Sequence, residues 1–170
     1  MGTRSGDVDP AALLHVAGRE EIGLVELNAM LNKHSGLLGI SGISHDMRTL
    51  LEAEATGDPR AKLAIDVFCY RLRKYVAAYM GVLGGVDGLA FAGGIGENSS
   101  VVRSRICEGL GFLGIQLDET KNAAGEPVIS ADAAGAQVRV IRTDEEIIIA
   151  KAVCRILGGA AIDRYTELRE

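Results

Sequence analysis

The sequence predicts an α/β protein in which a helix-rich N-terminal portion is followed by a mainly parallel sheet with flanking helices. In the first half, apolar residues recur at steps of three and four positions, the spacing of a helix with one buried face. In the second half, short apolar runs bounded by glycine alternate with helical patterns, as in strands joined by helical crossovers. At 170 residues the chain is long enough for one packed domain and too short for two complete lobes joined by a hinge.

The first third of the chain predicts short helices separated by glycine. Apolar residues after Asp9-Pro10 follow two helical runs, which Gly23 interrupts. Residues 35–42 are apolar and rich in glycine, which predicts a turn that lies against other backbone. A modest helix is expected from Met47 to Ala55.

The longest predicted helix begins at Asp58-Pro59, an N-cap followed by proline at the first helical position, and ends at Gly84-Gly85. Its apolar stripe predicts the central helix of the core. The stripe consists of Ala64, Val67, Phe68, Leu72, Val76, Tyr79, Met80 and Leu83.

The second half predicts three strands. The first, Leu89–Ala92, leads through a glycine turn into a helix, and the others are Leu113–Leu117 and Val138–Ile141. Residues 121–137 between these last two are polar and rich in Ala and Gly, and are expected to form a loop or loose hairpin. Thr143 is predicted to cap a last helix that runs through Leu157.

The composition favours an ordered core and argues against two kinds of partner. Hydrophobic residues make up 48% and charged residues 24%, as in ordinary globular proteins. A net charge of -5 and an aromatic content of 4% do not suit a nucleic-acid partner. No stretch is apolar for long enough to cross a bilayer, so no membrane association is expected.

The N-terminus and the cysteines predict a cytoplasmic protein. The first residues lack the apolar segment of a secretory signal. Cys69, Cys107 and Cys154 are odd in number and widely spaced, which suggests neither a disulfide framework nor a zinc site and fits a reducing compartment.

The glycine cluster at residues 91–100 is the first candidate binding element. Glycines let a ligand approach the backbone, and the helix that follows offers unpaired N–H groups to an anion. The cluster lacks the lysine of a Walker A loop, and Ser99 replaces the third glycine of the dinucleotide fingerprint. A tight strand-to-helix turn without a ligand is an equal alternative.

Three further groups carry polar chemistry, each with a plain alternative. The carboxylates of residues 144–146 suit a hydrated magnesium ion or simply complement a helix dipole. Arg4 lies in a glycine-flanked segment that is either an anion-binding loop or a frayed terminus. Asp46 before Met47-Arg48 could accept a hydrogen bond from a ribose or base, or could be an N-cap with a local ion pair.

Four segments in this order, MGTRSGDVDP, SGLLGISGISHDMR, FAGGIGENSS and IRTDEEIIIA, resemble the C-terminal half of the acetate and propionate kinase family. The resemblance implies the sugar kinase, heat-shock 70 and actin superfamily, in which two ribonuclease-H-like lobes close over ATP and magnesium. Residues 1–170 are then expected to be a truncated C-terminal nucleotide-binding lobe, with the N-terminal lobe absent. The isolated chain is expected to be inactive or nearly so.

The resemblance also implies roles for single residues. Arg4 would be catalytic and would stabilise charge on the transferring phosphoryl group. Asp46, Met47 and Arg48 would line the adenosine side of the pocket, and Glu145 would help to bind Mg²⁺ through water. The nucleotide-accepting turn would consist of Gly93, Gly94, Ile95, Gly96 and Glu97.

The expected reaction is reversible phosphoryl transfer from ATP to acetate, which gives acetyl phosphate and ADP, with this chain supplying the ATP-binding part. Propionate or butyrate as the acceptor is one alternative, because the residues that would measure the acyl chain lie mostly outside this chain. A non-catalytic nucleotide-binding or dimerisation module is the other. The resemblance further implies a homodimer formed through this lobe.

Overall fold

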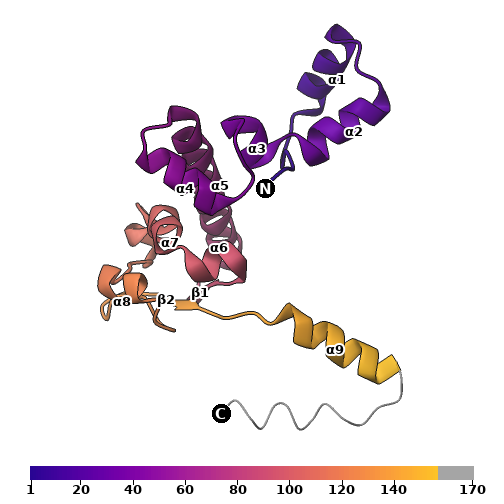
Figure 1. The fold of residues 1–170 in the computed structure, drawn as a ribbon. Helices are drawn as coiled ribbons and strands as arrows, with labels where there is room; N and C mark the ends of the chain where they lie inside the picture. The colour runs from indigo at the N-terminus through magenta and orange to yellow at the C-terminus, as the bar shows by residue number, and fades with distance from the viewer. Residues whose placement is uncertain (157–170) are drawn as a thin grey trace.

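The structure is a computed structural model that describes residues 1–156, apart from the side chain of Glu145. Its elements in chain order are α1 (Pro10–Arg19), α2 (Leu24–Lys33), α3 (Gly36–Ser41), α4 (Met47–Ala55), α5 (Pro59–Leu83), β1 (Gly88–Phe91), α6 (Gly93–Asn98), α7 (Ser100–Cys107), the 3₁₀-helix η1 (Gly111–Leu113), α8 (Glu119–Ala124), β2 (Gln137–Val140) and α9 (Glu145–Ile156). Helices α3 to α8 and both strands form the body, while α1 with α2 and α9 project from it at two separate places (Figure 1).

Helix α5 is the centre of the core, as predicted. The Asp58 carboxylate accepts hydrogen bonds of 2.8 Å from the N–H groups of Arg60 and Ala61, and Gly84 ends the helix in the left-handed conformation with φ 75°. Helices α3, α4 and α7 pack against it. These local capping signals explain why both ends of the helix were predictable.

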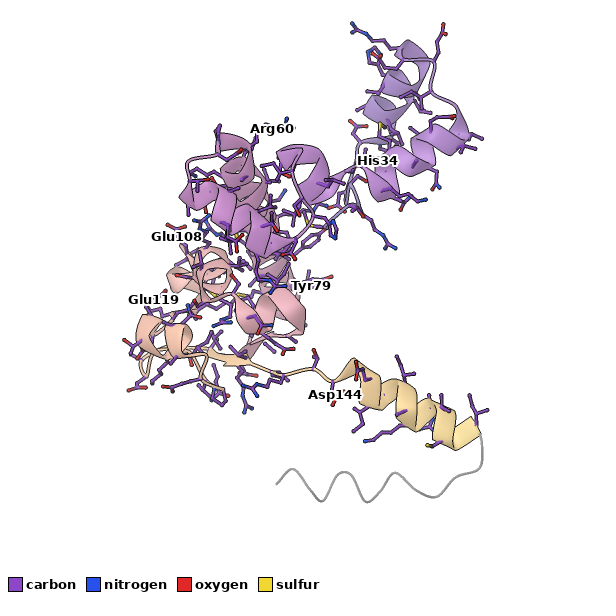
Figure 2. The ribbon with its side chains drawn as sticks, in the orientation of Figure 1. His34, Arg60, Tyr79, Glu108, Glu119 and Asp144 are labelled. Atoms are coloured by element: carbon purple, nitrogen blue, oxygen red, sulfur yellow. The ribbon has the colours of Figure 1, made fainter. Side chains whose placement is uncertain are left out.

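The predicted apolar stripe of α5 is only partly buried. Ala64, Phe68 and Met80 lie in the core, whereas Tyr79, labelled in Figure 2, is 64% exposed and Leu83 is 69% exposed. Most buried residues of α5 fall in its first half. The prediction was too broad because periodicity identifies an apolar face but not how far along the helix its neighbours extend.

Strands β1 and β2 form a parallel pair, with Gly88 opposite Gln137 and Phe91 opposite Val140. The parallel arrangement is confirmed, and within the described residues the sheet has two strands. The predicted strand at 113–117 is wrong: Gly114 adopts φ 86° and interrupts the extended chain, so that only Leu117 makes an isolated bridge, to Ser130.

Three irregular predictions turn out to be helical in part. Residues 36–41 form α3 and residues 93–98 form α6, because glycine lowers helix propensity without forbidding a short helix that packing supports. The expected loop at 121–137 begins inside α8, which Asp118 caps. The rest of this segment resembles the predicted loose hairpin, since Val128 forms an isolated antiparallel bridge with Arg139.

The N-terminal segment is held against α2 and α3 by backbone hydrogen bonds. The N–H groups of Ser35 and Leu37 donate to the carbonyls of Thr3 and Met1 at 2.9 and 3.0 Å. Gly36 makes this close approach possible: it has φ 63°, and a Cβ there would lie 2.1 Å from the Met1 carbonyl oxygen. The frayed-terminus alternative therefore does not describe this segment.

Helix α9 follows β2 after a short irregular stretch (Figure 1). Four of its apolar side chains are exposed: Ile148, Ile149, Val153 and Ile156. Across residues 1–156, no helix is both long enough and apolar enough to span a membrane.

Candidate functional site

Two of the predicted binding segments meet at one cavity of about 570 Å³. One wall comes from the start of α4, and the other comes from α6 and the junction between α6 and α7. The lining residues are His45, Asp46, Met47, Arg48, Leu51, Gly94, Ile95, Asn98 and Ser99. Ligand pockets in proteins range from roughly 300 to 1,000 Å³, so this cavity is large enough for a small organic ligand.

The wall formed by α4 combines a buried anchor with exposed charges. Met47 is buried in the core and fixes the start of the helix. Asp46 caps α4 by accepting a 2.8 Å hydrogen bond from the N–H of Arg48, and its other oxygen lies 3.8 Å from the Arg48 guanidinium. The N-cap and ion-pair alternative thus describes the local contacts correctly. The Arg48 side chain is nonetheless 87% exposed, which leaves a solvent-accessible cation at the cavity.

Gly94 and Ile95 line the cavity from the wall formed by α6. A Cβ built on Gly94 meets nothing within 4 Å, so this glycine leaves open space. The helix is braced at its exposed side, where the Asn98 amide donates a 2.9 Å hydrogen bond to the Gly94 carbonyl.

Glu97 lies on α6 and contacts both the start of its own helix and Thr143. Its Oε1 atom accepts hydrogen bonds from the N–H of Gly93 at 3.0 Å, the N–H of Thr143 at 2.8 Å and the hydroxyl of Thr143 at 2.6 Å. The Thr143 hydroxyl, followed by the two backbone donors, lowers the pKa of Glu97 below its ordinary value. The Gly93 N–H at the start of α6 therefore already has a carboxylate partner.

Five of the predicted binding residues line this cavity together: Asp46, Met47, Arg48, Gly94 and Ile95. Gly94 and Ile95 also line a second, largely apolar cavity of about 430 Å³, where they are joined by Gly93, Gly96 and residues of α5, β1 and α7. Glu97 is not among the lining residues of either cavity. Among the lining residues of the first cavity, His45, Leu51, Asn98 and Ser99 were not assigned a role individually. Asn98 and Ser99 lie inside the predicted glycine cluster at residues 91–100, and His45 lies next to Asp46, so only Leu51 lies outside the segments that were singled out.

Arg4 is exposed on the N-terminal segment and is not among the residues that line the cavity. The segment nevertheless passes close to it, since a Cβ on Gly2 would lie 3.4 Å from the Cβ of His45. A second anchor holds the segment to α5, where the Tyr75 hydroxyl donates a 2.6 Å hydrogen bond to Asp7 and Arg71 forms an ion pair with the same carboxylate.

Sequence reasoning missed Arg103, a charged residue that is only 1% exposed. Its Nη1 donates to the carbonyls of Gly96 and Glu97, both at 2.9 Å, and its Nε and Nη2 donate to the side chain and carbonyl of Asn122, both at 2.8 Å. Burial lowers the pKa of Arg103, while neighbouring Glu119 partly offsets this effect. Arg103 thereby joins the end of α6 to α8.

Glu145 is the first residue of α9, and its side chain lies outside the part of the chain that the structure describes. Among the described residues, no group of three or more His, Cys, Asp or Glu side chains is arranged to hold a metal ion. The predicted cap is also different: the Asp144 carboxylate accepts the 3.0 Å hydrogen bond from the N–H of Ile147, because Thr143 is engaged with Glu97 (Figure 2 labels Asp144).

Solved kinases share this fold of helices around a small parallel sheet. The acetate kinase of Porphyromonas gingivalis superposes with a TM-score of 0.85 at 42% identity, over 92% of this chain and 40% of that one. A propionate kinase from Francisella tularensis gives a TM-score of 0.83 at 43% identity, over 88% and 38%.

The chain belongs to the acetokinase family, whose family model matches residues 1–151. Acetate kinase from Symbiobacterium thermophilum is 51% identical over 159 residues, which is 92% of this chain and 40% of that protein. Propionate kinase from Citrobacter rodentium is 49% identical over 156 residues, covering 92% and 39%. The chain thus spans about 40% of the length of the curated relatives it matches.

Proposed function

We propose that this chain is the C-terminal nucleotide-binding lobe of an acetate kinase and supplies the ATP-binding part of an enzyme that moves a phosphoryl group reversibly between ATP and acetate. The observation that carries the proposal is the 570 Å³ cavity at which Asp46–Arg48 and Gly94–Ile95 meet. Both segments belong to the motifs expected to contact the nucleotide, and they come from distant parts of the sequence. Membership of the acetokinase family supports the same reaction.

The proposal includes the finer fold assignment to one ribonuclease-H-like lobe of the sugar kinase, heat-shock 70 and actin superfamily. The parallel β1–β2 pair, with its helical crossover, supports this assignment. A cytoplasmic homodimer is part of the same proposal. The free cysteines are compatible with a reducing compartment, and the exposed apolar side chains of α9 offer surface that a second copy could cover.

In this proposal Asp46 to Arg48 contact the adenosine side of the nucleotide, and the α6 backbone at Gly94 and Ile95 approaches it from the opposite wall. Arg4 is the catalytic residue, because its guanidinium fork suits the equatorial oxygens of a transferring phosphoryl group. The anchors of the N-terminal segment would limit the freedom of Arg4, so less conformational entropy is lost when it meets its substrate.

Magnesium fits the donors at the start of α9. Residues 144–146 are all carboxylates, the hard oxygen ligands that Mg²⁺ prefers, and Glu145 would hold the ion through water. When bound, the ion would neutralise charge on the nucleotide phosphates.

Calorimetry with MgADP and the 170-residue chain tests the nucleotide site. We expect the chain to bind one MgADP and Gly94→Val to weaken binding at least tenfold, because the added methyl groups enter open space in the cavity. Gly18→Val is the matched control, since Gly18 also lies in a helix and has nothing within 4 Å. Absence of binding by the unmodified chain would contradict the proposal.

The reaction is tested by measuring ATP formation from acetyl phosphate and MgADP, with a complete enzyme of the family as the positive control. Binding without turnover by the chain is expected, because the N-terminal lobe must present the substrate. Propionyl and butyryl phosphate, compared with acetyl phosphate in the complete enzyme, separate the three possible acceptors. If the chain bound no nucleotide and showed no turnover, a non-catalytic dimerisation module would be the better interpretation.

A further inference from the structure

The Glu97 carboxylate joins two segments that lie 46 residues apart in the sequence. One oxygen, Oε1, accepts from Gly93 at the start of α6 and from both the N–H and the hydroxyl of Thr143. If Glu97 only stabilised the start of its own helix, the hydrogen bond from the Gly93 N–H would be sufficient. Two of the three hydrogen bonds go to Thr143, so the contact is directed at the segment that precedes α9.

The backbone that carries the Glu97 side chain is held in place by Arg103. The buried Arg103 guanidinium donates to the carbonyls of both Gly96 and Glu97, which holds the end of α6 in place. Hydrogen bonds from a charged donor are stronger than neutral ones, so this end of the short helix is better held than its length suggests.

The segment before α9 is fastened at two consecutive points. The N–H of Ile141 donates a 2.8 Å hydrogen bond to the carbonyl of Phe91, immediately before α6, and Thr143 follows with its two bonds to Glu97. The next residues begin α9 and carry the carboxylates of positions 144–146. The start of α9 is therefore set relative to the same helix whose Gly94 and Ile95 line the cavity.

We propose that Glu97 is a positioning residue: it fixes the acidic first turn of α9 relative to the α6 wall of the cavity, so that a nucleotide and its magnesium ion meet their protein partners in one defined arrangement. This inference rests on the proposed function for the identity of the ligand. Glu97 itself acts through Thr143 rather than by touching the nucleotide.

The first test needs no ligand and uses amide hydrogen exchange, followed by NMR, in the 170-residue chain. Thr143→Val removes the hydroxyl donor while keeping size and β-branching, and Thr143→Ser restores the donor. We expect the Thr143 amide to exchange at least tenfold faster in Thr143→Val and in Glu97→Ala, and Thr143→Ser to recover the original rate. Thr49→Val, at an exposed position of α4, is the control.

The second test titrates magnesium at fixed ADP. A residue that positions the acidic turn should change the magnesium dependence of ADP binding, whereas a purely structural residue should not. We expect Thr143→Val to raise the magnesium concentration for half-maximal binding about tenfold, to leave ADP affinity without magnesium unchanged, and Thr143→Ser to rescue the effect.

The outcomes separate the inference from the proposed function. Unchanged exchange at Thr143 in both Glu97→Ala and Thr143→Val overturns the inference, and so does an unchanged magnesium titration in a chain that binds ADP. If the unmodified chain binds no ADP, the proposed function fails and the positioning role for a nucleotide fails with it. Faster exchange together with a shifted magnesium titration supports both.

Discussion

Tyr75 and Asp7 lie 68 positions apart, and the Tyr75 hydroxyl donates a 2.6 Å hydrogen bond to the Asp7 carboxylate. Arg71 completes this contact: it pairs with Asp7, donates a 3.2 Å hydrogen bond to the Tyr75 hydroxyl and lies 5.5 Å from the centre of the Tyr75 ring. Gly6 has φ 73°, and a Cβ there would lie 3.2 Å from the Arg71 guanidinium, so the absence of a side chain makes room for this group. The segment that carries Arg4 is thereby tied to the central helix.

Tyr75→Phe should lower the free energy of unfolding by about 1 kcal/mol, the usual net contribution of one hydrogen bond. The ring and its packing stay, so the losses are the hydroxyl's 2.6 Å hydrogen bond to Asp7 and the longer, 3.2 Å one that it accepts from Arg71. Urea unfolding followed by circular dichroism measures the change. Tyr70→Phe, on an exposed part of α5, is the control. An equal loss of unfolding free energy in both variants would show that the contact between Tyr75 and Asp7 does not stabilise the chain.

Arg103→Met should destabilise the chain by about 3–5 kcal/mol, because it leaves the carbonyls of Gly96, Glu97 and Asn122 without their buried donor. Arg139→Met, on the exposed side of β2, should change stability by no more than about 0.5 kcal/mol. The same urea titration compares the two. If the two variants unfolded at similar urea concentrations, the carbonyls of Gly96, Glu97 and Asn122 would have found water or other donors in Arg103→Met.

The contact between Glu97 and Thr143 should weaken in acid. The folded-state pKa of Glu97 lies below its ordinary value of 4.5, so its stabilising contribution is present above that value and is lost as the pH falls through the folded-state pKa. Titration of the Glu97 carboxyl by ¹³C NMR should give a midpoint below 4.5, and Thr143→Val should raise it. A midpoint that does not respond to Thr143→Val would remove the hydroxyl as the main cause.

Cys69 and Cys107 should resist alkylation in the folded chain at pH 8. Burial raises the pKa of Cys69 to about 11 and that of Cys107 to about 12, so the reactive thiolate is scarce at both. Iodoacetamide labelling, read by peptide mass spectrometry, should mark the partly exposed Cys154 first and reach the other two only in urea. Rapid labelling of Cys107 without denaturant would show that α7 opens readily.

The sequence predicted those features that depend on local chemistry. Asp58 with Pro59 and the glycine at position 84 mark the ends of α5, because capping and left-handed backbone are properties of neighbouring residues. The parallel strand pair was predicted from the alternation of short apolar runs with helical patterns in the second half, and β1 and β2 confirm it. The Asp46–Arg48 and Gly94–Ile95 wall residues were found through motif resemblance rather than through periodicity.

Features that depend on long-range contacts were not predictable in this way. No local pattern indicates that Glu97 accepts hydrogen bonds from Thr143, and the expected cap therefore moved to Asp144. Arg103 follows the apolar Val102 in the sequence, but nothing local reveals that Asn122 and two carbonyls of α6 will surround it. These contacts are set by tertiary packing, which overrides local propensity.

The close contact between Gly36 and the N-terminal segment restricts which amino acids position 36 can tolerate. The Met1 carbonyl oxygen would lie 2.1 Å, and the Arg4 carbonyl oxygen 2.8 Å, from any Cβ at this position, and both are backbone atoms that cannot rotate aside. Even alanine would have to push residues 1–4 out of their seat, on top of the strain at φ 63°. If codon 36 were randomised and folded molecules were selected, glycine alone should survive at this position, which would show that folding depends on the close contact between Gly36 and residues 1–4.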